Sequence, residues 1–407
     1  MMTTSHDEKV RQIVAHAYAN APAVKKIFNE VGITPTDVQR VTDLEKIPIT
    51  SKDEMAELQA ANPPFGGFLA VPLGALRHVF LSPGPLYEPS TEESAVLDTV
   101  RDVLAIAGFA AGDVVINTFG YHLIPTGLAI DQVLTQMGTT VIPAGVGNAD
   151  LQIKMMRDLG VTCYVGTPSW LMTLIEKTEE SGLGFDHFSL QKALVSAEPL
   201  PPALRHTFVE KYGLSITNAY GTAELGFLAY NTEGGLPMRL LKTPIIQVAN
   251  SETGETVAPG EAGEVVVTTF NETYPLIRLG TGDLAMNLDP APGKSRQEER
   301  SIILVGRVGD AVKVRGMFVH PNQLRFALSQ VTEIAGAQAV VSRPANRDEF
   351  NLRVVLSQER VDREALAQKL ETAVQSTCRV KVDHIEFVAS ETIPTGAKII
   401  LDERTWG

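Results

Sequence analysis

The stretch Ile216-Thr217-Asn218-Ala219-Tyr220-Gly221-Thr222-Ala223-Glu224-Leu225-Gly226 decides how this chain is interpreted. The apolar residues before Gly221 predict the end of a strand, and a glycine there lets the backbone approach another group closely. Glu224 is then expected on a tight loop just past the strand, where a carboxylate can hold a cation. Taken alone, such a Tyr-Gly-x-x-Glu turn is better explained as an ordinary connection between a strand and a loop.

Length, composition and charge narrow the class of protein. A chain of 407 residues is too long for one small core, so two or three domains are expected. A hydrophobic content of 44% with 20% charged residues is typical of a soluble globular protein. The net charge of −13 argues against nucleic acid or an anionic membrane as the main partner, but leaves room for a local basic cleft.

Cysteine usage and the N-terminus indicate the compartment. Cys163 and Cys378 are too few for a zinc cluster and do not suggest a disulfide framework. The polar segment 1–11 lacks the apolar core of a signal peptide, and no apolar run is long enough to span a membrane. We therefore expect a cytoplasmic protein with no nucleic-acid or membrane partner.

Strand and helix patterns alternate in the middle of the chain. An amphipathic helix is predicted over 92–108, a buried strand over 113–119, strands that run into loops over 141–145, 161–170 and 193–199, and a helix over 149–159. This strand–helix–strand repeat predicts right-handed parallel crossovers. It also predicts that ligands bind beyond the carboxyl ends of the strands. The segment 254–269 is expected to be mostly strands. One or two further helices are predicted over 6–31.

Several motifs then follow one another in a specific order. Gly280-Thr281-Gly282-Asp283-Leu284 and the stretch from Gly306 to Gly316 resemble, in order and spacing, the adenylate-forming superfamily, which joins carboxylates to AMP and then to a thiol. Phe119-Gly120-Tyr121, Val141-Ile142-Pro143-Ala144-Gly145 and Thr167-Pro168-Ser169-Trp170 resemble phenylacetate–CoA ligases in particular. The chain is identified as a phenylacetate–CoA ligase-like member of that superfamily.

The resemblance implies an α/β fold in two parts. Residues 1–306 would form a large N-terminal adenylate-forming domain with parallel-sheet units. Residues 307–407 would form a small, mobile α+β C-terminal domain, with Gly309 and Asp310 as its hinge. Gly306-Arg307 would follow a strand over 301–305 and begin the linker to that domain. The tail supports this, because 323–330 and 363–377 predict helices, and 337–342, 351–356 and 381–388 predict strands.

The resemblance also implies roles for individual residues. Lys398 would stabilise charge at the α-phosphate, and Glu224 would hold Mg²⁺; the alternative for Lys398 is a solvated lysine on a turn. Tyr121, His122 and Gly127 would line the carboxylate pocket, although His122 also fits a hydrogen-bonded wall residue. Arg315 and Gly316 would serve the thiol step with CoA. The nucleotide would be bound by Ser82, Gly84, Ser196, Ala197, Glu198, Pro199, Asn218, Tyr220, Gly221, Thr222, Asp283 and Arg307.

The activity implied is that of an AMP-forming ligase. It would activate an aromatic or other small carboxylate as an acyl-adenylate and transfer it to CoA, using ATP, Mg²⁺ and CoA. No zinc is expected, since the loop 289–295, where zinc-binding relatives carry cysteines, has none. A homodimer is left open. The alternatives are a relative that passes the acyl group to an acceptor other than CoA, and a non-catalytic protein that binds a nucleotide or a carboxylate.

The phosphate-binding motifs depart from the family pattern, which we interpret as a degenerate phosphate loop. Ser82, Gly84 and Pro89 match the family's loop, but Pro83 and Pro85 remove two backbone donors. A proline-rich turn after a strand is an equally good interpretation of this segment. Other departures lie in the later motifs. Gly280 replaces an arginine, Ala223 stands where relatives carry Ser or Thr, and Ala397 separates the glycine of the tail from Lys398.

Overall fold

A computed structural model describes residues 5–82, 86–91, 95–182, 184–310, 312–314, 317–319, 321–344, 348–358, 361–378, 380–394 and 396–404. The chain divides into two compact units. Unit 1 comprises 1–246, 266–281 and 294–302, and unit 2 comprises 247–265, 282–293 and 303–407. The domain boundary expected after residue 306 stays a prediction.

Unit 1 begins with two helices, α1 (His6–Asn20) and α2 (Pro22–Glu30), where one or two were predicted. The hydroxyl of Ser5 caps α1 by accepting a hydrogen bond from the Glu8 amide at 3.2 Å, which satisfies one of the free donors of the first turn. The following segment contains two short 3₁₀ helices, η1 (Pro35–Asp37) and η2 (Val41–Lys46).

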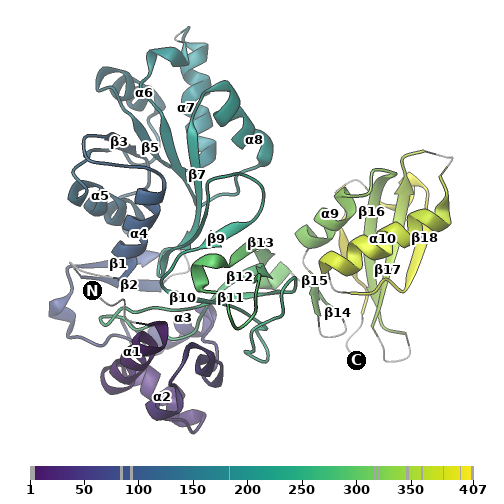
Figure 1. Cartoon of the computed structure of the whole chain (residues 1–407), viewed down its shortest axis with the longest axis horizontal. Coiled ribbons are helices and arrows are strands. Elements are labelled where there is room, and N and C mark those ends of the chain that lie inside the picture. Colours follow the sequence, from purple (N-terminus) through teal and green to yellow (C-terminus); the bar gives the residue numbers. More distant parts are fainter. Residues whose placement is uncertain are drawn as a thin grey trace. The chain divides into compact units, whose positions relative to one another are not determined.

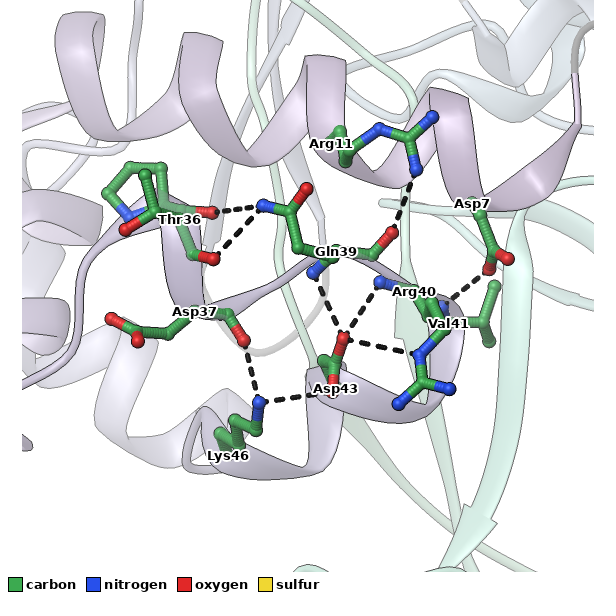
Figure 2. A network of polar contacts seen from close by, with 10 residues as sticks. Asp7, Arg11, Thr36, Asp37, Gln39, Arg40, Val41, Asp43 and Lys46 are labelled. Carbon is green, nitrogen blue, oxygen red and sulfur yellow. Dashed lines mark hydrogen bonds and ion pairs between the residues drawn. The ribbon is translucent and has the colours of Figure 1, made fainter.

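A polar network fixes the segment around η2 beside α1 (Figure 2). The carboxylate of Asp43 accepts hydrogen bonds from the amides of Gln39 and Arg40 and pairs with Lys46 at 3.0 Å. Arg11 of α1 donates to the Gln39 carbonyl at 3.0 Å. These bonds hold the segment that leads into the next helix, α3 (Lys52–Ala61).

A large mixed sheet forms the centre of unit 1 (Figure 1). Its strands lie in the order β13-β9-β8-β7-β6-β5-β3-β4, and β4, β3, β5, β6 and β7 are parallel to their neighbours in this series. The predicted parallel units are therefore confirmed. The strands are β3 (Val114–Asn117), β4 (Thr140–Pro143), β5 (Cys163–Gly166), β6 (Lys192–Val195), β7 (Ser215–Thr222), β8 (Gly226–Asn231), β9 (Met238–Leu240) and β13 (Ser301–Arg307).

Successive residues of these strands enter two different cores, one on each face of the sheet. Val115 and Leu194 pack in the core that contains α4 and α5, whereas Ile116 and Ala193 pack in the core that contains α6 and α7. Side chains of a strand alternate between faces, so burial on both sides explains the near-continuous apolar runs in the sequence. The helices are α4 (Ala95–Ile106), α5 (Thr126–Gln136), α6 (Ala149–Asp158), α7 (Pro168–Glu180), α8 (Pro202–His206) and the π-helix η5 (Thr207–Lys211).

Residues 78–90 form a structure that the sequence did not predict. They make an antiparallel hairpin of β1 (His78–Ser82) and β2 (Leu86–Ser90). The expected arrangement was a proline-rich turn after a strand; Pro89 is tolerated in a strand because the hairpin is a two-stranded sheet with open edges.

Unit 2 contains parts of four strands and a small α+β body. The strands β10 (Ile245–Ala249), β11 (Ala262–Thr268), β12 (Leu279–Leu288) and β13 are each divided between the two units. Two predictions need correction here. Within 254–269 only β11 is a strand, because the part before it turns back with the Val257 amide bonded to Val248. The strand β13 includes Gly306 and Arg307, which were expected to begin a linker.

The end of the chain has its own sheet and core. Its strands lie in the order β18-β17-β16-β19, with α9 and α10 packed in the same core (Figure 1). The helices and strands match the predicted order, and β19 was not predicted. The elements are β14 (Val312–Val314), β15 (Met317–Val319), α9 (Pro321–Ser329), β16 (Ile334–Ser342), β17 (Glu349–Leu356), α10 (Arg363–Cys378), β18 (His384–Phe387) and β19 (Ile400–Asp402). Within the described part of the chain, every helix is too short or too polar to cross a membrane.

Candidate active site

The turn between β7 and β8 carries the motif that opened the sequence analysis. Glu224 lies on this turn, as predicted, but β7 continues through Thr222 instead of ending before Gly221. A β-carbon on Gly221 would lie 2.3 Å from the Gly226 carbonyl oxygen. The close approach that this glycine permits is therefore to the neighbouring strand β8, and it tightens the turn that presents Glu224.

The carboxylate of Glu224 pairs with Lys52 at 3.1 Å. Only 5% of the Glu224 side chain is exposed, against 25% for Lys52. Lys52 is the first residue of α3, and the Ser51 hydroxyl caps that helix by accepting from the Glu54 amide at 3.1 Å. Sequence patterns did not indicate a role for Lys52, because no local pattern links two residues 172 positions apart.

A second carboxylate, Glu88 on β2, belongs to the same charged group. Glu88 is 5% exposed, and its Oε1 atom is buried with no hydrogen-bond partner among the described residues. Burial, and next the charge of Glu224, raise the pKa of Glu88 to about 7, against the opposing effects of Ser82 and Lys52. No sequence signal marked Glu88, since its burial depends on the unpredicted hairpin.

Gln59 of α3 holds that hairpin in place. Its side chain accepts from the Tyr87 amide at 2.7 Å, and donates to the Tyr87 carbonyl at 3.0 Å and to the Tyr274 hydroxyl at 3.1 Å. The helix that carries Lys52 thus also fixes the strand that carries Glu88. Of the predicted phosphate-loop residues, Ser82 is buried and donates to the Leu86 carbonyl at 3.4 Å. Gly84 lies outside the described residues.

The turn after β6 contains four residues predicted to contact the adenine. Ser196 is buried, and its hydroxyl donates to the Ala219 carbonyl of β7 at 2.7 Å. Ala197 has a φ of 69°, a conformation that strains a residue with a β-carbon and that often accompanies function. Glu198 accepts from the Ser169 amide at 3.4 Å, and Pro199 is exposed. Ser196 therefore ties two strands together and leaves the next three residues at the surface.

The side chains predicted along β7 differ in their surroundings. Asn218 is half-buried, and the buried Tyr220 has its hydroxyl 3.5 Å from the Thr281 hydroxyl. The Thr222 hydroxyl is buried with no partner among the described residues. An unpartnered buried hydroxyl costs free energy, so Thr222 is a group that a ligand could satisfy.

The residues predicted for the carboxylate pocket lie just before and at the start of α5. The Tyr121 hydroxyl accepts from Asn117 at 2.9 Å and donates to Asp131 at 3.0 Å, and burial followed by the Asp131 charge raises the pKa of Tyr121. His122 is exposed. A β-carbon on Gly127 would lie 2.4 Å from the Gly120 carbonyl oxygen, so this glycine is required by packing of the loop itself.

In unit 2, Asp283 pairs with Arg307 at 3.5 Å, and the Arg307 side chain is 65% exposed. The neighbouring Glu264 accepts from the Gly282 amide at 2.9 Å. Burial raises the pKa of Glu264, the Gly282 hydrogen bond lowers it, and the Asp283 charge adds to the increase. Gly282 has a φ of 75°, which a glycine adopts readily, so Glu264 fixes the backbone of β12 just before Asp283.

Lys398 is exposed, and its carbonyl accepts from the Gln338 side chain of β16 at 2.8 Å. The backbone of the predicted catalytic lysine is thus anchored while its side chain reaches solvent. Gly309 and Asp310 lie in the 3₁₀ turn Val308–Asp310. Arg315 and Gly316 lie outside the described residues.

A small cavity of about 50 Å³ lies beside the Glu224 turn and is lined by both Glu88 and Glu224. A larger cavity of about 720 Å³ in unit 1 holds none of the predicted site residues among its described lining. Of these two cavities, only the smaller is lined by a predicted site residue, Glu224. Among the described residues there is no group of three or more His, Cys, Asp or Glu side chains that could hold a metal. Mg²⁺ needs fewer, since it is commonly held by one or two carboxylates plus water and phosphate oxygens.

Comparison with known proteins finds relatives that match almost the whole chain. A family described as "AMP-binding enzyme" matches residues 94–271. A phenylacetate-coenzyme A ligase of Aromatoleum evansii is 28% identical over 421 residues, covering 98% of this chain and 93% of the relative. The phenylacetate-coenzyme A ligase of Thermus thermophilus is 29% identical, covering 86% of this chain and 81% of the relative.

Solved structures agree on the fold. An open conformation of 2-hydroxyisobutyryl-CoA ligase, in complex with 2-HIB-AMP and CoA, superposes with a TM-score of 0.80 at 23% identity. The superposition covers 98% of this chain and 91% of that protein. At this identity the likeness establishes the fold.

Proposed function

This chain is a phenylacetate–CoA ligase-like member of the adenylate-forming enzymes, and from that premise we propose that it joins a small carboxylate to CoA through an acyl-adenylate. The observation that carries the proposal is the match along 98% of the chain to a phenylacetate–CoA ligase. The buried Glu224 on the β7–β8 turn supports it, because a site that handles Mg·ATP requires such a carboxylate.

The proposed reaction has two steps. In the first, a carboxylate oxygen of the substrate attacks the α-phosphorus of ATP, the bond to the β-phosphate breaks, and pyrophosphate leaves. In the second, the CoA sulfur attacks the acyl carbon after losing its proton, and AMP leaves with the electron pair of the carbon–oxygen bond. Both steps develop negative charge on oxygen, which preorganised donors and cations stabilise.

Residues of both units would contribute to these two steps. In unit 1, Glu224 would hold Mg²⁺, which neutralises phosphate charge when bound, and the unpartnered Thr222 hydroxyl would donate to a phosphate oxygen. In unit 2, Asp283 would accept hydrogen bonds from the ribose hydroxyls, and Lys398 would approach the α-phosphate from its exposed position. Gly309 and Asp310 would form the hinge on which the small body turns.

The remaining site residues are proposed on the same basis. Tyr121, His122 and Gly127 would line the carboxylate pocket, and Arg315 and Gly316 would serve the CoA step. Ser82, Gly84, Ser196, Ala197, Glu198, Pro199, Asn218, Tyr220, Gly221 and Arg307 would contact the nucleotide.

The experiment that tests the proposal is a product assay. The protein is mixed with ATP, Mg²⁺, CoA and one member of a panel of aromatic and short aliphatic carboxylates, and AMP and acyl-CoA are measured by mass spectrometry. We expect AMP and acyl-CoA in equal amounts with at least one carboxylate. AMP formed without acyl-CoA would indicate another acceptor, and no AMP with any carboxylate would favour a binding protein.

A further inference from the structure

The cavity beside Glu224 is enclosed by five parts of unit 1. The hairpin β1–β2, the helices α4 and α5, the β7–β8 turn and the segment 271–274 all contribute to its wall. At about 50 Å³ it has room for a small ion with a few ordered waters, and is too small for a nucleotide or an aromatic ring. Its polar lining includes Glu88, Ser90, Glu224 and Asn271.

The cavity is lined by two carboxylates, those of Glu88 and Glu224, and by no lysine or arginine among the described residues. Lys52 does not line the cavity, but its ammonium group pairs with the Glu224 carboxylate at 3.1 Å. When both acids are ionised, one ammonium group opposes two carboxylates, which leaves an excess of one negative charge.

Glu88 is the residue that this arrangement leaves unsatisfied. It is 5% exposed, it faces the cavity, and its Oε1 atom has no hydrogen-bond partner among the described residues. Its strand is held rigidly, because Gln59 bonds both backbone groups of the adjacent Tyr87. A buried acceptor that is fixed in position without a hydrogen-bond partner lowers the free energy of unfolding. A ligand that binds this oxygen would remove that cost.

We propose that Glu88 and Glu224 together form a divalent-cation site, in which Glu88 is a second protein ligand for Mg²⁺ alongside the carboxylate expected from the family pattern. Carboxylate oxygens are the ligands that hard cations prefer, and Mg²⁺ retains several waters around one or two of them. A doubly charged ion offsets both carboxylates at once. Together with Lys52 it gives the cavity a net positive charge.

This site supplies positive charge near a segment whose sequence is poor in phosphate-binding groups. Pro83 and Pro85 have no amide hydrogen and so cannot donate backbone hydrogen bonds to phosphates. A cation held deeply by two glutamates provides positive charge for phosphate oxygens by another route. That use of the site rests on the proposed function, whereas the metal site itself does not depend on it.

The test uses Mn²⁺ alone as the probe, with the full chain and no nucleotide. Free Mn²⁺ is measured by electron paramagnetic resonance during a titration. We expect one site in the wild type, and a loss of affinity of at least about tenfold in Glu88→Gln and in Glu224→Gln, by analogy with losses seen when metal-site partners are removed. Lys52→Met removes a competing cation and is expected to tighten Mn²⁺ binding several-fold. Glu57→Gln, an exposed acid on α3, is the matched control and should not change the affinity.

Two results would overturn the inference: wild-type protein that binds no Mn²⁺ at millimolar concentration, or Glu88→Gln that binds it as well as the wild type. Circular dichroism checks that each variant is folded. The outcomes also separate the two proposals. If the protein turns over a carboxylate and Glu88→Gln leaves the metal affinity unchanged, only the proposed role of Glu88 is ruled out. If metal binding depends on Glu88 but no AMP is formed, only the proposed ligase activity is ruled out.

Discussion

Two buried glutamates, one in each unit, lie beside predicted site residues and are used differently. Glu264 in unit 2 is 6% exposed, and its carboxylate accepts a hydrogen bond from the Gly282 amide, so it fixes the backbone of β12 before Asp283. Glu88 in unit 1 is equally buried, yet one of its oxygens has no partner among the described residues. Burial raises the pKa of both. The difference teaches that burial alone does not mark a ligand site: a carboxylate whose acceptor positions are filled by backbone is structural, and one left open in a cavity is available.

The largest effect is expected at Lys398, an exposed lysine of unit 2, in contrast to the buried glutamates of unit 1. Lys398→Ala should lower the rate of adenylation about 10²–10³-fold, because one charge-stabilising group is lost. Thioester formation from a supplied acyl-adenylate should be largely kept. Lys369→Ala, at a partly exposed lysine that pairs with Glu333 in the same small body, is the control. Equal loss in both half-reactions would show that Lys398 does not act specifically at the α-phosphate.

Glu88→Gln should stabilise the metal-free protein above pH 7. The pKa of Glu88 is about 7 when folded and 4.5 in the unfolded chain, so the folded state binds more protons between these values and wild-type stability falls as pH rises through them. The charges that act on Glu88 are those of Glu224, on the β7–β8 turn, and Lys52, on α3. The glutamine variant avoids this loss, and its free energy of unfolding should exceed that of the wild type by roughly 3 kcal/mol at pH 8.

Urea unfolding in the presence of a chelator, at pH 4.5 and pH 8, measures this difference. At pH 4.5 the two proteins should converge. A constant difference at both pH values would mean that the charge of Glu88 is not the cause. The same measurement on Glu264→Gln sharpens the comparison, since that carboxylate has a backbone donor.

Asp283→Ala should weaken AMP binding by about 1.5–3 kcal/mol, because a charged hydrogen-bond acceptor for the ribose is lost. Asp283→Asn keeps an acceptor oxygen and should lose less. Calorimetry of AMP binding measures both. Unchanged affinity in the alanine variant would move the ribose site away from Asp283 and its partner Arg307.

The smallest effect is expected at the structural glutamate. Glu264→Gln retains an oxygen that can accept the Gly282 amide, so its free energy of unfolding at pH 7 should change by less than about 1 kcal/mol. Its affinity for Mn²⁺ should equal that of the wild type. A tenfold loss of Mn²⁺ affinity in this variant would remove the distinction between the two glutamates.

The sequence predicted the parts of this molecule that are determined by local pattern. Strands such as β3 and β6 are apolar on both faces and followed by glycines or helices, so periodicity was enough to find them. The glutamate turn was also found, because Gly221 and Glu224 stand in one short motif. The predicted roles of the individual site residues stay predictions.

What was missed depends on long-range contacts. The pairing of Lys52 with Glu224 joins residues 172 positions apart, and the burial of Glu88 requires the hairpin to be held by Gln59 of α3. The proline-rich segment that contains β2 lacks the alternation of apolar and polar residues that indicates a strand, so it was interpreted as a turn. Likewise, Gly221 was expected to make room for an unnamed group, and only the antiparallel partner β8 reveals that this group is the Gly226 carbonyl.

The most direct test of the ligase account is isotope exchange between labelled pyrophosphate and ATP in the wild-type protein, without CoA. The account predicts exchange that requires Mg²⁺ and depends on the carboxylate supplied, because pyrophosphate returns to ATP only through a reversible acyl-adenylate. Protein that binds AMP by calorimetry but shows no exchange with any carboxylate of a broad aromatic and aliphatic panel would contradict it.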